Sequence, residues 1–448
     1  MNTVANLGLP LLLAICAALG FCLDTQAQSP DAASLQQMLD RDDYIGCYTA
    51  LDQVDRARFT EAQRAYFFGM VAFHLGHLGD NADPAPMLDK ALRSKDKSLT
   101  AHQIESALET LGQINLKLGN FSASAQNYDD IDKIFGSQLG DGEKSIRESR
   151  HLAALLQHVP RQTVEISGDF TLPRTGVEYP VGVPNPPSSK PLFAQFDTGA
   201  ELSVLSATTA KAWGVTMLDG EATLHGYSGG AFTAQPGYIP VLRIGKAELH
   251  NVAVYVTADE NLYISQVKLQ TNALLGYPVV AALGRLTFAK DGSLTVTAKS
   301  PARDLRSSAA LWMSDHTLLV ELGTQPVISN GKLTGVTGAR LFMLDTGSGS
   351  TWLTDRFLVE HADLFHGPPG EMARLAGAGG IREIPAYGAR NLPLLAGGTV
   401  LFLNGPHILT QPAGGEAEQF FGVLGRDTLG VFSSYTVDFR NMTLTVQR

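Results

Sequence analysis

Residues 192–206 read LFAQFDTGAELSVLS, and residues 341–353 read LFMLDTGSGSTWL. In each stretch an apolar run predicts a β-strand, and Asp-Thr-Gly follows it directly. One such tripeptide is expected by chance in on the order of a tenth of chains this long. Two copies in the same local setting, 148 positions apart, indicate instead that Asp197 and Asp345 have the same task.

Further landmarks repeat at nearly the same offset. The triplet LLG at 274–276 recurs as VLG at 423–425, 149 positions later, and RLTFAKDGSLTV is matched by YTVDFRNMTLTV. After residue 160 the chain consists of short Val, Leu, Thr and Phe runs separated by Gly, Pro and Asn, which is typical of strands and turns. The shared offset predicts an internal duplication, with β-rich lobes at 164–300 and 305–448.

At these residues the chain resembles the aspartic peptidases, from residue 164 to 448. The stretch around Asp197 is similar to the catalytic loop of retropepsins, and the stretch around Asp345 to that of pepsins. The resemblance implies a bilobal all-β acid-protease fold in which each apolar-apolar-Gly strand packs against the catalytic loop of its own lobe. GRD at 425–427 is also similar to a retropepsin sequence, whereas GYP at 276–278 departs from it.

The chemistry explains why two aspartates would be needed. Two carboxyl groups about 3 Å apart cannot both ionise, so they share one proton. The ionised group takes a proton from a water molecule, the protonated group polarises the scissile carbonyl, and no covalent intermediate forms. The resemblance implies that Thr198 and Thr346 lock the two loops together.

The residues after each Thr complete the candidate site. Gly199 and Gly347 would let the backbone approach the carboxyl groups without a Cβ clash. The next residue is Ala200 in one lobe and Ser348 in the other. Because a hydroxyl could donate to the adjacent carboxylate and alanine cannot, we expect Asp345 to be the more readily ionised partner.

Two glycine-rich stretches predict hairpins that could close over substrate as flaps. They are LHGYSGGAFTAQPGYI and RLAGAGGIREIPAYG, at 224–239 and 374–388. A closing hairpin would exclude water and add strand-like hydrogen bonds to an extended peptide. The alternative is an ordinary mobile surface turn. The candidate substrate-binding residues are Tyr227, Gly229, Gly230, Gly379 and Gly380.

Residues 28–158 form a predicted helical domain. Apolar residues recur there at intervals of three and four, and two stretches each suggest a helix ending in Leu-Gly, at Leu78-Gly79 and Leu118-Gly119, followed by a second helix. The pattern resembles tetratricopeptide-like helical hairpins at a spacing of about 40 residues. Such a domain would recruit substrates or protein partners, or act as a removable inhibitory segment. The predicted fold class is thus multidomain α and β, with α-helical hairpins before two duplicated β lobes.

Residues 1–27 read as a secretory signal, with an apolar run that ends in small residues, although no Lys or Arg precedes it. An uncleaved membrane anchor is the alternative. We expect an exported, periplasmic or secreted protein of bacterial type, with no membrane contact after cleavage. Cys47 is the one cysteine beyond this segment, so the fold has no intrachain disulfide and Cys47 is expected to pack as a small apolar residue.

Composition and motifs bear on other functions. A net charge of −10 without a Lys/Arg cluster argues against nucleic acid as a partner. His74 with His77, and His361 with His366, lack further ligands at metal spacing, so neither a metal site nor a cofactor is expected. The predicted partner is a polypeptide substrate, and two lobes in one chain make a monomer sufficient.

The main functional hypothesis is an aspartic endopeptidase. One alternative is a catalytically silent scaffold that binds peptides without cleaving them. A second is a glycoside hydrolase with paired carboxylates, which requires carboxyl groups at least about 5 Å apart.

Overall fold

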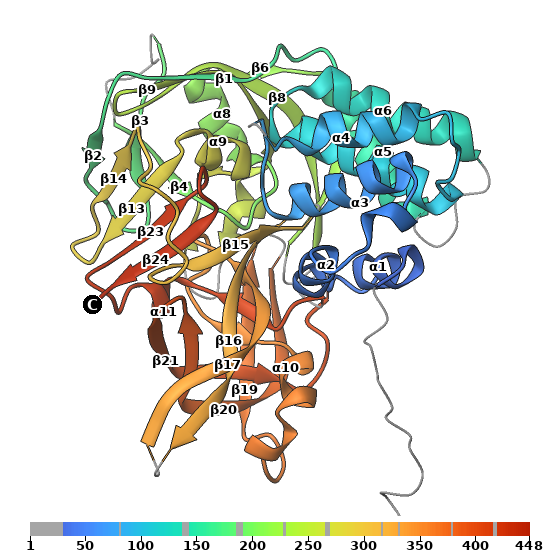
Figure 1. Cartoon of the computed structure of the whole chain (residues 1–448). Coiled ribbons are helices and arrows are strands. Elements are labelled where there is room, and N and C mark those ends of the chain that lie inside the picture. The colour runs from blue at the N-terminus through green and yellow to red at the C-terminus, as the bar shows by residue number, and fades with distance from the viewer. Residues whose placement is uncertain are drawn as a thin grey trace, which may run out of the picture. The chain divides into compact units, whose positions relative to one another are not determined.

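The computed structural model describes residues 30–79, 82–136, 143–184, 191–226, 230–264, 269–314, 317–329, 332–377, 380–414 and 419–448 (Figure 1). The predicted signal at 1–27 lies outside the described residues. The chain divides into two compact units, Met1–Phe59 and Thr60–Arg448, which are described separately.

The first unit contains two short helices, α1 (Ala32–Leu39) and α2 (Tyr44–Leu51). Each begins after an aspartate whose carboxylate accepts a backbone N–H of the first turn, as N-caps do. Cys47 lies buried on α2, and burial raises the pKa of its thiol to about 12. The thiol therefore stays protonated at neutral pH and packs as an apolar group, as expected.

The second unit begins with five helices. Capping boxes at Thr60 and Thr100 start the first and third of them, because each threonine and a glutamine three residues later satisfy exposed backbone N–H groups. α3 packs against α4 and α5 against α6. The helices are α3 (Glu61–His74), α4 (Pro84–Arg93), α5 (Ala101–Lys117), α6 (Phe121–Phe135) and α7 (Glu143–Leu156).

Of the two helix ends predicted at Leu-Gly pairs, one agrees with the structure and the other does not. α5 ends at Lys117, and Gly119 takes a φ of 65°, which suits a glycine after a helix end. α3 ends earlier than expected, at His74, with Gly76 at a φ of 74°. The sequence HLGHLG offers two Leu-Gly pairs, and the first one stops the helix, so Leu78-Gly79 lies in the following turn.

The first sheet holds nine strands, in the order β3-β4-β12-β5-β9-β8-β6, with β1 on β9 and β7 on β8. Its strands are β1 (Thr163–Ile166), β3 (Tyr179–Val181), β4 (Leu192–Phe196), β5 (Ser203–Ser206), β6 (Thr216–Met217), β7 (Ala222–His225), β8 (Ala231–Ile244), β9 (Ala247–Thr257) and β12 (Ala273–Leu275). Two helices, α8 (Ala207–Trp213) and α9 (Tyr277–Ala282), and a small ribbon, β10 (Tyr263–Ile264) with β11 (Leu269–Gln270), accompany it.

The second sheet holds thirteen strands, in the order β19-β20-β21-β18-β22-β17-β16-β15-β24-β23-β13-β14-β2. They are β2 (Phe170–Leu172), β13 (Arg285–Ala289), β14 (Leu294–Thr297), β15 (Ala309–Met313), β16 (Leu318–Ser329), β17 (Lys332–Leu344), β18 (Trp352–Leu353), β19 (Glu371–Gly377), β20 (Gly380–Ala396), β21 (Thr399–Leu409), β22 (Gly422–Leu424), β23 (Ser434–Asp438) and β24 (Thr443–Gln447). Helices α10 (Asp355–Glu360) and α11 (Arg426–Leu429) lie in its connections.

One end of this second sheet is shared between distant parts of the chain. Strands β2, β13 and β14 pair beside β23, β24 and β15, so the yellow and red strands adjoin in Figure 1. Phe288 on β13 faces Tyr435 on β23, and the neighbouring Thr287 and Thr436 hydroxyls lie 2.8 Å apart. The β-rich part is therefore joined by backbone hydrogen bonds as well as by side-chain packing.

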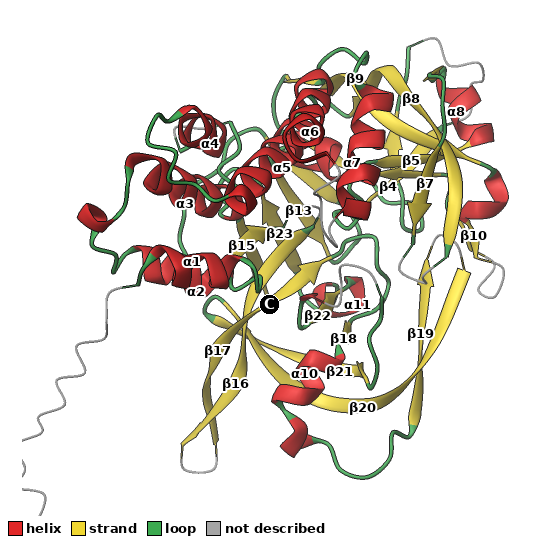
Figure 2. Cartoon of the chain, turned by 90° about the vertical axis from the view of Figure 1, so that its right-hand side faces the viewer, coloured by secondary structure: helices red, strands yellow, loops and turns green. Residues whose placement is uncertain are grey.

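The helices of the second unit lie beside the strands in Figure 2, and the two share an apolar core. Leu116 and Phe121 pack in one cluster with Leu202 and Tyr255. Gln162 connects the same regions, because its backbone N–H donates to the Gly119 carbonyl and its side chain to the Pro278 carbonyl. The helices are thus a packed layer of this unit.

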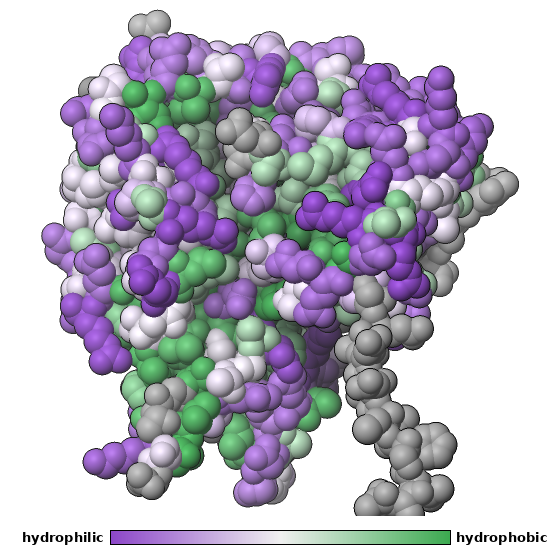
Figure 3. All heavy atoms as spheres, in the orientation of Figure 1, coloured by the Kyte–Doolittle hydropathy of each residue, from purple (hydrophilic) through white to green (hydrophobic). Residues whose placement is uncertain are grey.

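On the face shown in Figure 3, apolar side chains reach the surface over the ribbon of β16 and β17. Val327 and Ile328, near the end of β16, are exposed. In the described ranges, none of the helices combines the length and the apolarity that crossing a bilayer requires.

Candidate active site

Parallel strand pairs bring the two aspartates to their places. β4 runs parallel to β12, and the Asp197 N–H donates to the Leu275 carbonyl at 3.0 Å. β17 runs parallel to β22 in the same way, and the Asp345 N–H donates to the Leu424 carbonyl at 3.2 Å. Each aspartate therefore stands where a buried strand ends.

The glycine of each apolar triplet lies against the loop of its own aspartate. A Cβ at Gly276 would lie 2.5 Å from the Leu202 carbonyl carbon, and a Cβ at Gly425 would lie 2.6 Å from the Ser350 carbonyl oxygen. Only glycine allows such contact with a backbone. This is the packing that the resemblance implied for the triplets.

The two threonines connect the loops by reciprocal hydrogen bonds. The Thr198 N–H donates to the Thr346 hydroxyl at 3.1 Å, and the Thr346 N–H donates to the Thr198 hydroxyl at 3.0 Å. The Thr198 hydroxyl donates in turn to the Leu344 carbonyl at 2.5 Å, and the Thr346 hydroxyl to the Phe196 carbonyl at 2.9 Å. All of these groups are buried, so the network fixes one loop relative to the other.

Each carboxyl group lies against the glycine of the opposite loop, since a Cβ at Gly347 would lie 2.4 Å from the Asp197 Cγ and one at Gly199 2.8 Å from the Asp345 Cγ, and each group shifts the pKa of the other. Paired glycosidase carboxylates are instead separated by about 5 Å or more. Asp345 is only 4 % exposed. Burial, and then the charge of Asp345, raise the pKa of Asp197 well above its ordinary value. This arrangement holds one proton on Asp197.

Asp345 receives more hydrogen bonds than its partner does. Burial raises its pKa, but the backbone N–H groups of Ser348 and Gly347 donate to one carboxylate oxygen at 2.8 and 2.7 Å and oppose that rise. Among the described residues, the Asp197 carboxylate accepts one backbone N–H, that of Gly199, at 2.9 Å. These hydrogen bonds favour the ionised form of Asp345 over that of Asp197.

The expected order of ionisation thus arises from a different donor. The Ser348 hydroxyl donates to the Ser350 carbonyl at 2.9 Å rather than to Asp345. The expectation that this hydroxyl would favour the ionised form is wrong, because the side chain is turned away. The Ser348 backbone N–H does that work, and Ala200 makes no such bond to Asp197 among the described residues.

Gln195 is a site residue that the sequence reasoning missed. It is 5 % exposed on β4, and its side-chain amide donates to the Gly347 carbonyl at 2.8 Å. The corresponding position 148 residues later is Met343, which cannot donate. The sequence did carry a signal for Gln195, because a polar residue inside the apolar strand LFAQF needs a buried hydrogen-bond partner.

Arg426 places a positive charge near the pair. Burial raises the pKa of both Asp197 and Asp345, and the charge of Arg426 opposes that rise in part. The next residue, Asp427, accepts the Thr351 N–H at 2.9 Å and the Thr351 hydroxyl at 2.6 Å, which ties α11 to the loop after Asp345. The GRD sequence therefore supplies both a positive charge near the two carboxyl groups and hydrogen bonds that hold the loop after Asp345.

The predicted flaps are hairpins in their described parts. His225 pairs with Ala231 across β7 and β8, and Gly377 pairs with Gly380 across β19 and β20. The Gly230 carbonyl accepts the Gly226 N–H at 3.0 Å, and a Cβ added at Gly380 would meet no described atom within 4 Å. Tyr227, Gly229 and Gly379 lie outside the described residues. The flap function stays a prediction.

The histidines considered as ligands have other surroundings. His74 is buried, and its Nδ1 lies 2.7 Å from the Met313 carbonyl oxygen, so it connects α3 with β15. His361 packs against the Phe357 ring. Across the part of the chain that the structure describes, no three His, Cys, Asp or Glu side chains are grouped to hold a metal ion.

Residues 188–279 match the sequence model of the family described as aspartyl protease, which supports an aspartic peptidase family for this protein. Two solved structures are similar. Basic 7S globulin from soybean has 9 % identity and a TM-score of 0.35, over 64 % of this chain and 94 % of its own. A retropepsin-like aspartic protease from Rickettsia conorii has 19 % identity and a TM-score of 0.21, over 30 % and 93 %. No curated protein matches the chain.

Proposed function

We propose that this protein is an aspartic endopeptidase built from two duplicated lobes, which hydrolyses peptide bonds between Asp197 and Asp345. One observation carries the proposal: the carboxyl groups of Asp197 and Asp345 each lie against the glycine of the opposite loop, while reciprocal Thr198 and Thr346 bonds hold the two loops together. The match of residues 188–279 to the aspartyl protease family supports it independently.

The asymmetry of the pair assigns the roles. Asp345, with two backbone donors, is the ionised group that removes a proton from water. The hydroxide equivalent adds to the scissile carbonyl carbon, while the proton on Asp197 is donated toward the carbonyl oxygen. Collapse of the tetrahedral intermediate breaks the C–N bond, and the amine leaves with a proton returned from the pair. No bond to the enzyme forms.

We further propose that the substrate is an extended polypeptide, which the two hairpins cover, and that the protein is exported and acts as a monomer. The helical layer would recruit partners or substrates. Its common core with Leu202 and Tyr255 supports a permanent part rather than a removable inhibitory segment. Leu202 lies in the loop that carries Asp197, so displacing the helices would disturb the site.

A peptide-library digest tests the proposal. The purified protein is compared with Asp197→Asn and Asp345→Asn, and with Asp363→Asn, in which the replaced aspartate is exposed. We expect cleavage by the unmodified protein and by Asp363→Asn, inhibition by an aspartic-peptidase transition-state analogue, and no cleavage by the other two. Cleavage that survives either site substitution would refute the two-aspartate mechanism. Peptide binding without cleavage would establish the silent scaffold instead.

A further inference from the structure

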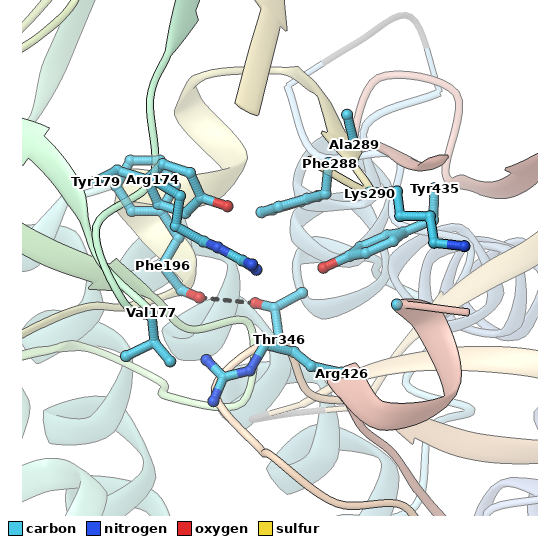
Figure 4. Close-up of a pocket in the computed structure, with 11 residues that line it drawn as sticks. Arg174, Val177, Tyr179, Phe196, Phe288, Ala289, Lys290, Thr346, Arg426 and Tyr435 are labelled. Atoms are coloured by element: carbon cyan, nitrogen blue, oxygen red, sulfur yellow. Dashed lines mark hydrogen bonds between the residues drawn. The ribbon is translucent and has the colours of Figure 1, made fainter. Parts of the chain in front are cut away.

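A cavity of about 100 Å³ lies beside the catalytic loops and is not used by the proposed mechanism. Thr346 lines it, as does Phe196, which precedes Asp197. The other walls come from β13, β23, α11 and the segment around β3 (Figure 4). At about 30 Å³ per water molecule, the cavity has room for about three waters. That volume suits a small polyatomic ion.

Two buried tyrosines direct their hydroxyls into this space. Tyr179 is 5 % exposed and Tyr435 is 6 % exposed, and neither hydroxyl makes a hydrogen bond to a residue that the structure describes. Their rings are held in place: Tyr435 stacks on Phe288 at 4.7 Å, and Tyr179 lies 5.3 Å from Phe196. Hydroxyls that face a cavity take their hydrogen-bond partners from what fills it, so a ligand or water is expected here.

The tyrosine hydroxyls are donors at neutral pH. Burial raises the pKa of Tyr179 to about 12 and that of Tyr435 further. Figure 4 shows both hydroxyls and the Arg174 guanidinium directed toward the same space. A ligand that only accepts hydrogen bonds would satisfy all three groups.

The charge of the cavity has one sign. Arg174, Arg426 and Lys290 line it, and no acidic side chain does so among the described residues. The ammonium of Lys290 points away from the hydroxyls in Figure 4, so this residue lies at the rim. Nearby acids are Asp291, whose pKa is lowered by hydrogen bonds from Ser293 and then by the charge of Arg174, and the catalytic pair, whose burial-raised pKa values the charge of Arg426 opposes.

Neither arginine makes an ion pair or hydrogen bond through its guanidinium among the described residues. Gly292 lets the Arg174 guanidinium pack directly against the backbone, since a Cβ there would lie 2.6 Å from its Nε. Gly349 stands next to Arg426, where a Cβ would lie 3.8 Å from its Nη2. Guanidinium groups bind oxyanions through several N–H donors at once. Arg174 and the two hydroxyls, with Arg426 in the wall below Thr346, supply donors of the kind that an oxyanion accepts.

We propose that the cavity between Arg174, Arg426, Tyr179 and Tyr435 binds one small oxyanion of the size of phosphate. The site also has a consequence that rests on the proposed function. An anion next to Arg426 offsets the positive charge that favours ionisation of the catalytic pair. Binding and proton release are therefore linked, and phosphate raises the pH at which the acid limb of the peptidase activity falls.

Titration calorimetry with inorganic phosphate tests the site directly in the full chain, without any need for cleavage. We expect saturable binding of one phosphate per chain. Arg174→Gln should weaken it at least tenfold, because charge-assisted bonds are lost. Tyr435→Phe, which keeps the stacked ring, should weaken it severalfold. The matched controls Arg306→Gln and Tyr263→Phe, at exposed positions, should bind as the unmodified protein does.

Absence of saturable binding, or equal affinity in Arg174→Gln and Arg306→Gln, overturns the proposal. Because Tyr435→Phe removes one oxygen only, it keeps the test valid should Arg174→Gln fail to fold. Binding is measured equally in Asp197→Asn. A protein that binds phosphate but cleaves no peptide contradicts the proposed function and leaves this site standing. A protein that cleaves peptides but does not bind phosphate contradicts this site and leaves the proposed function standing.

Discussion

The carboxyl group of Asp197 rests directly on Gly347 of the opposite loop. A Cβ at residue 347 would lie 2.4 Å from the Asp197 Cγ, and a Cβ at Gly199 would lie 2.8 Å from the Asp345 Cγ. Each aspartate is thus held between its own loop and the glycine of the other. The separation of the two carboxyl groups depends on these contacts.

Gly347→Ala is expected to abolish activity, because the added methyl group must displace the Asp197 carboxyl group from its partner. A misplacement of about 1 Å near the reacting groups costs on the order of 100-fold in rate. The rate of peptide cleavage is the measurement. Gly370→Ala is the control, since residue 370 has nothing within 4 Å of an added Cβ. Equal rates for the two variants would contradict the contact.

Thr198→Val is expected to lower the free energy of unfolding by about 1–3 kcal/mol, because it leaves the Thr346 N–H and the Leu344 carbonyl without their buried partner. Thr198→Ser retains the hydroxyl and should recover most of the loss. Urea denaturation measures both. Thr295→Val, at an exposed threonine pair, is the control and should change stability by less than about 0.5 kcal/mol. A loss of similar stability in Thr295→Val would show that the Thr198–Thr346 hydrogen bonds have no special role.

Stability should depend on pH through Asp197. An aspartate in the unfolded chain titrates near pH 3.9. Above that pH the unfolded state has released a proton that folded Asp197 still holds, because its folded pKa is raised. The free energy of unfolding therefore falls as pH rises from about 4 to the folded pKa of Asp197. Asp197→Asn should lack this fall. If the free energy of unfolding, measured by urea denaturation, changed with pH in the same way in both proteins, Asp197 would not be the source of the fall.

Ser348→Ala is expected to leave the acid limb of the pH–rate profile nearly unchanged. The reason is that the hydroxyl bonds to Ser350, whereas the backbone N–H that favours ionised Asp345 remains. Peptide cleavage over a pH series gives the profile. A shift of the acid limb upward by about one pH unit would mean that the hydroxyl acts on Asp345 after all.

Phe121→Ala should destabilise the β-rich part as well as the helices. Phe121 is buried in the core shared with Leu202 and Tyr255, and such truncations cost about 3–5 kcal/mol. Helical circular dichroism and loss of cleavage should change together on denaturation. Ile134→Ala, at an exposed position on the same helix α6, is the control. Separate transitions for helices and activity would show an independent helical domain.

The sequence predicted the features that depend on local residue type. Asp-Thr-Gly after an apolar strand indicated where each aspartate would stand, and the order of helices before strands agrees with the structure. The direction of the Ser348 hydroxyl could not be predicted, because it depends on a rotamer and on a nearby carbonyl. The shared sheet was also hidden, since Thr287 and Thr436 meet through backbone pairing that many sequences can form.

The shared sheet also sets a time at which the catalytic pair can assemble. Thr287 and Thr436 are 149 positions apart, and a ribosome that adds about 5–20 residues per second needs on the order of ten seconds to make that interval. Until β23 and β24 have been synthesised, β13 lacks its neighbour and the two loops have no common support. During this delay the nascent chain carries Asp197 without a completed partner.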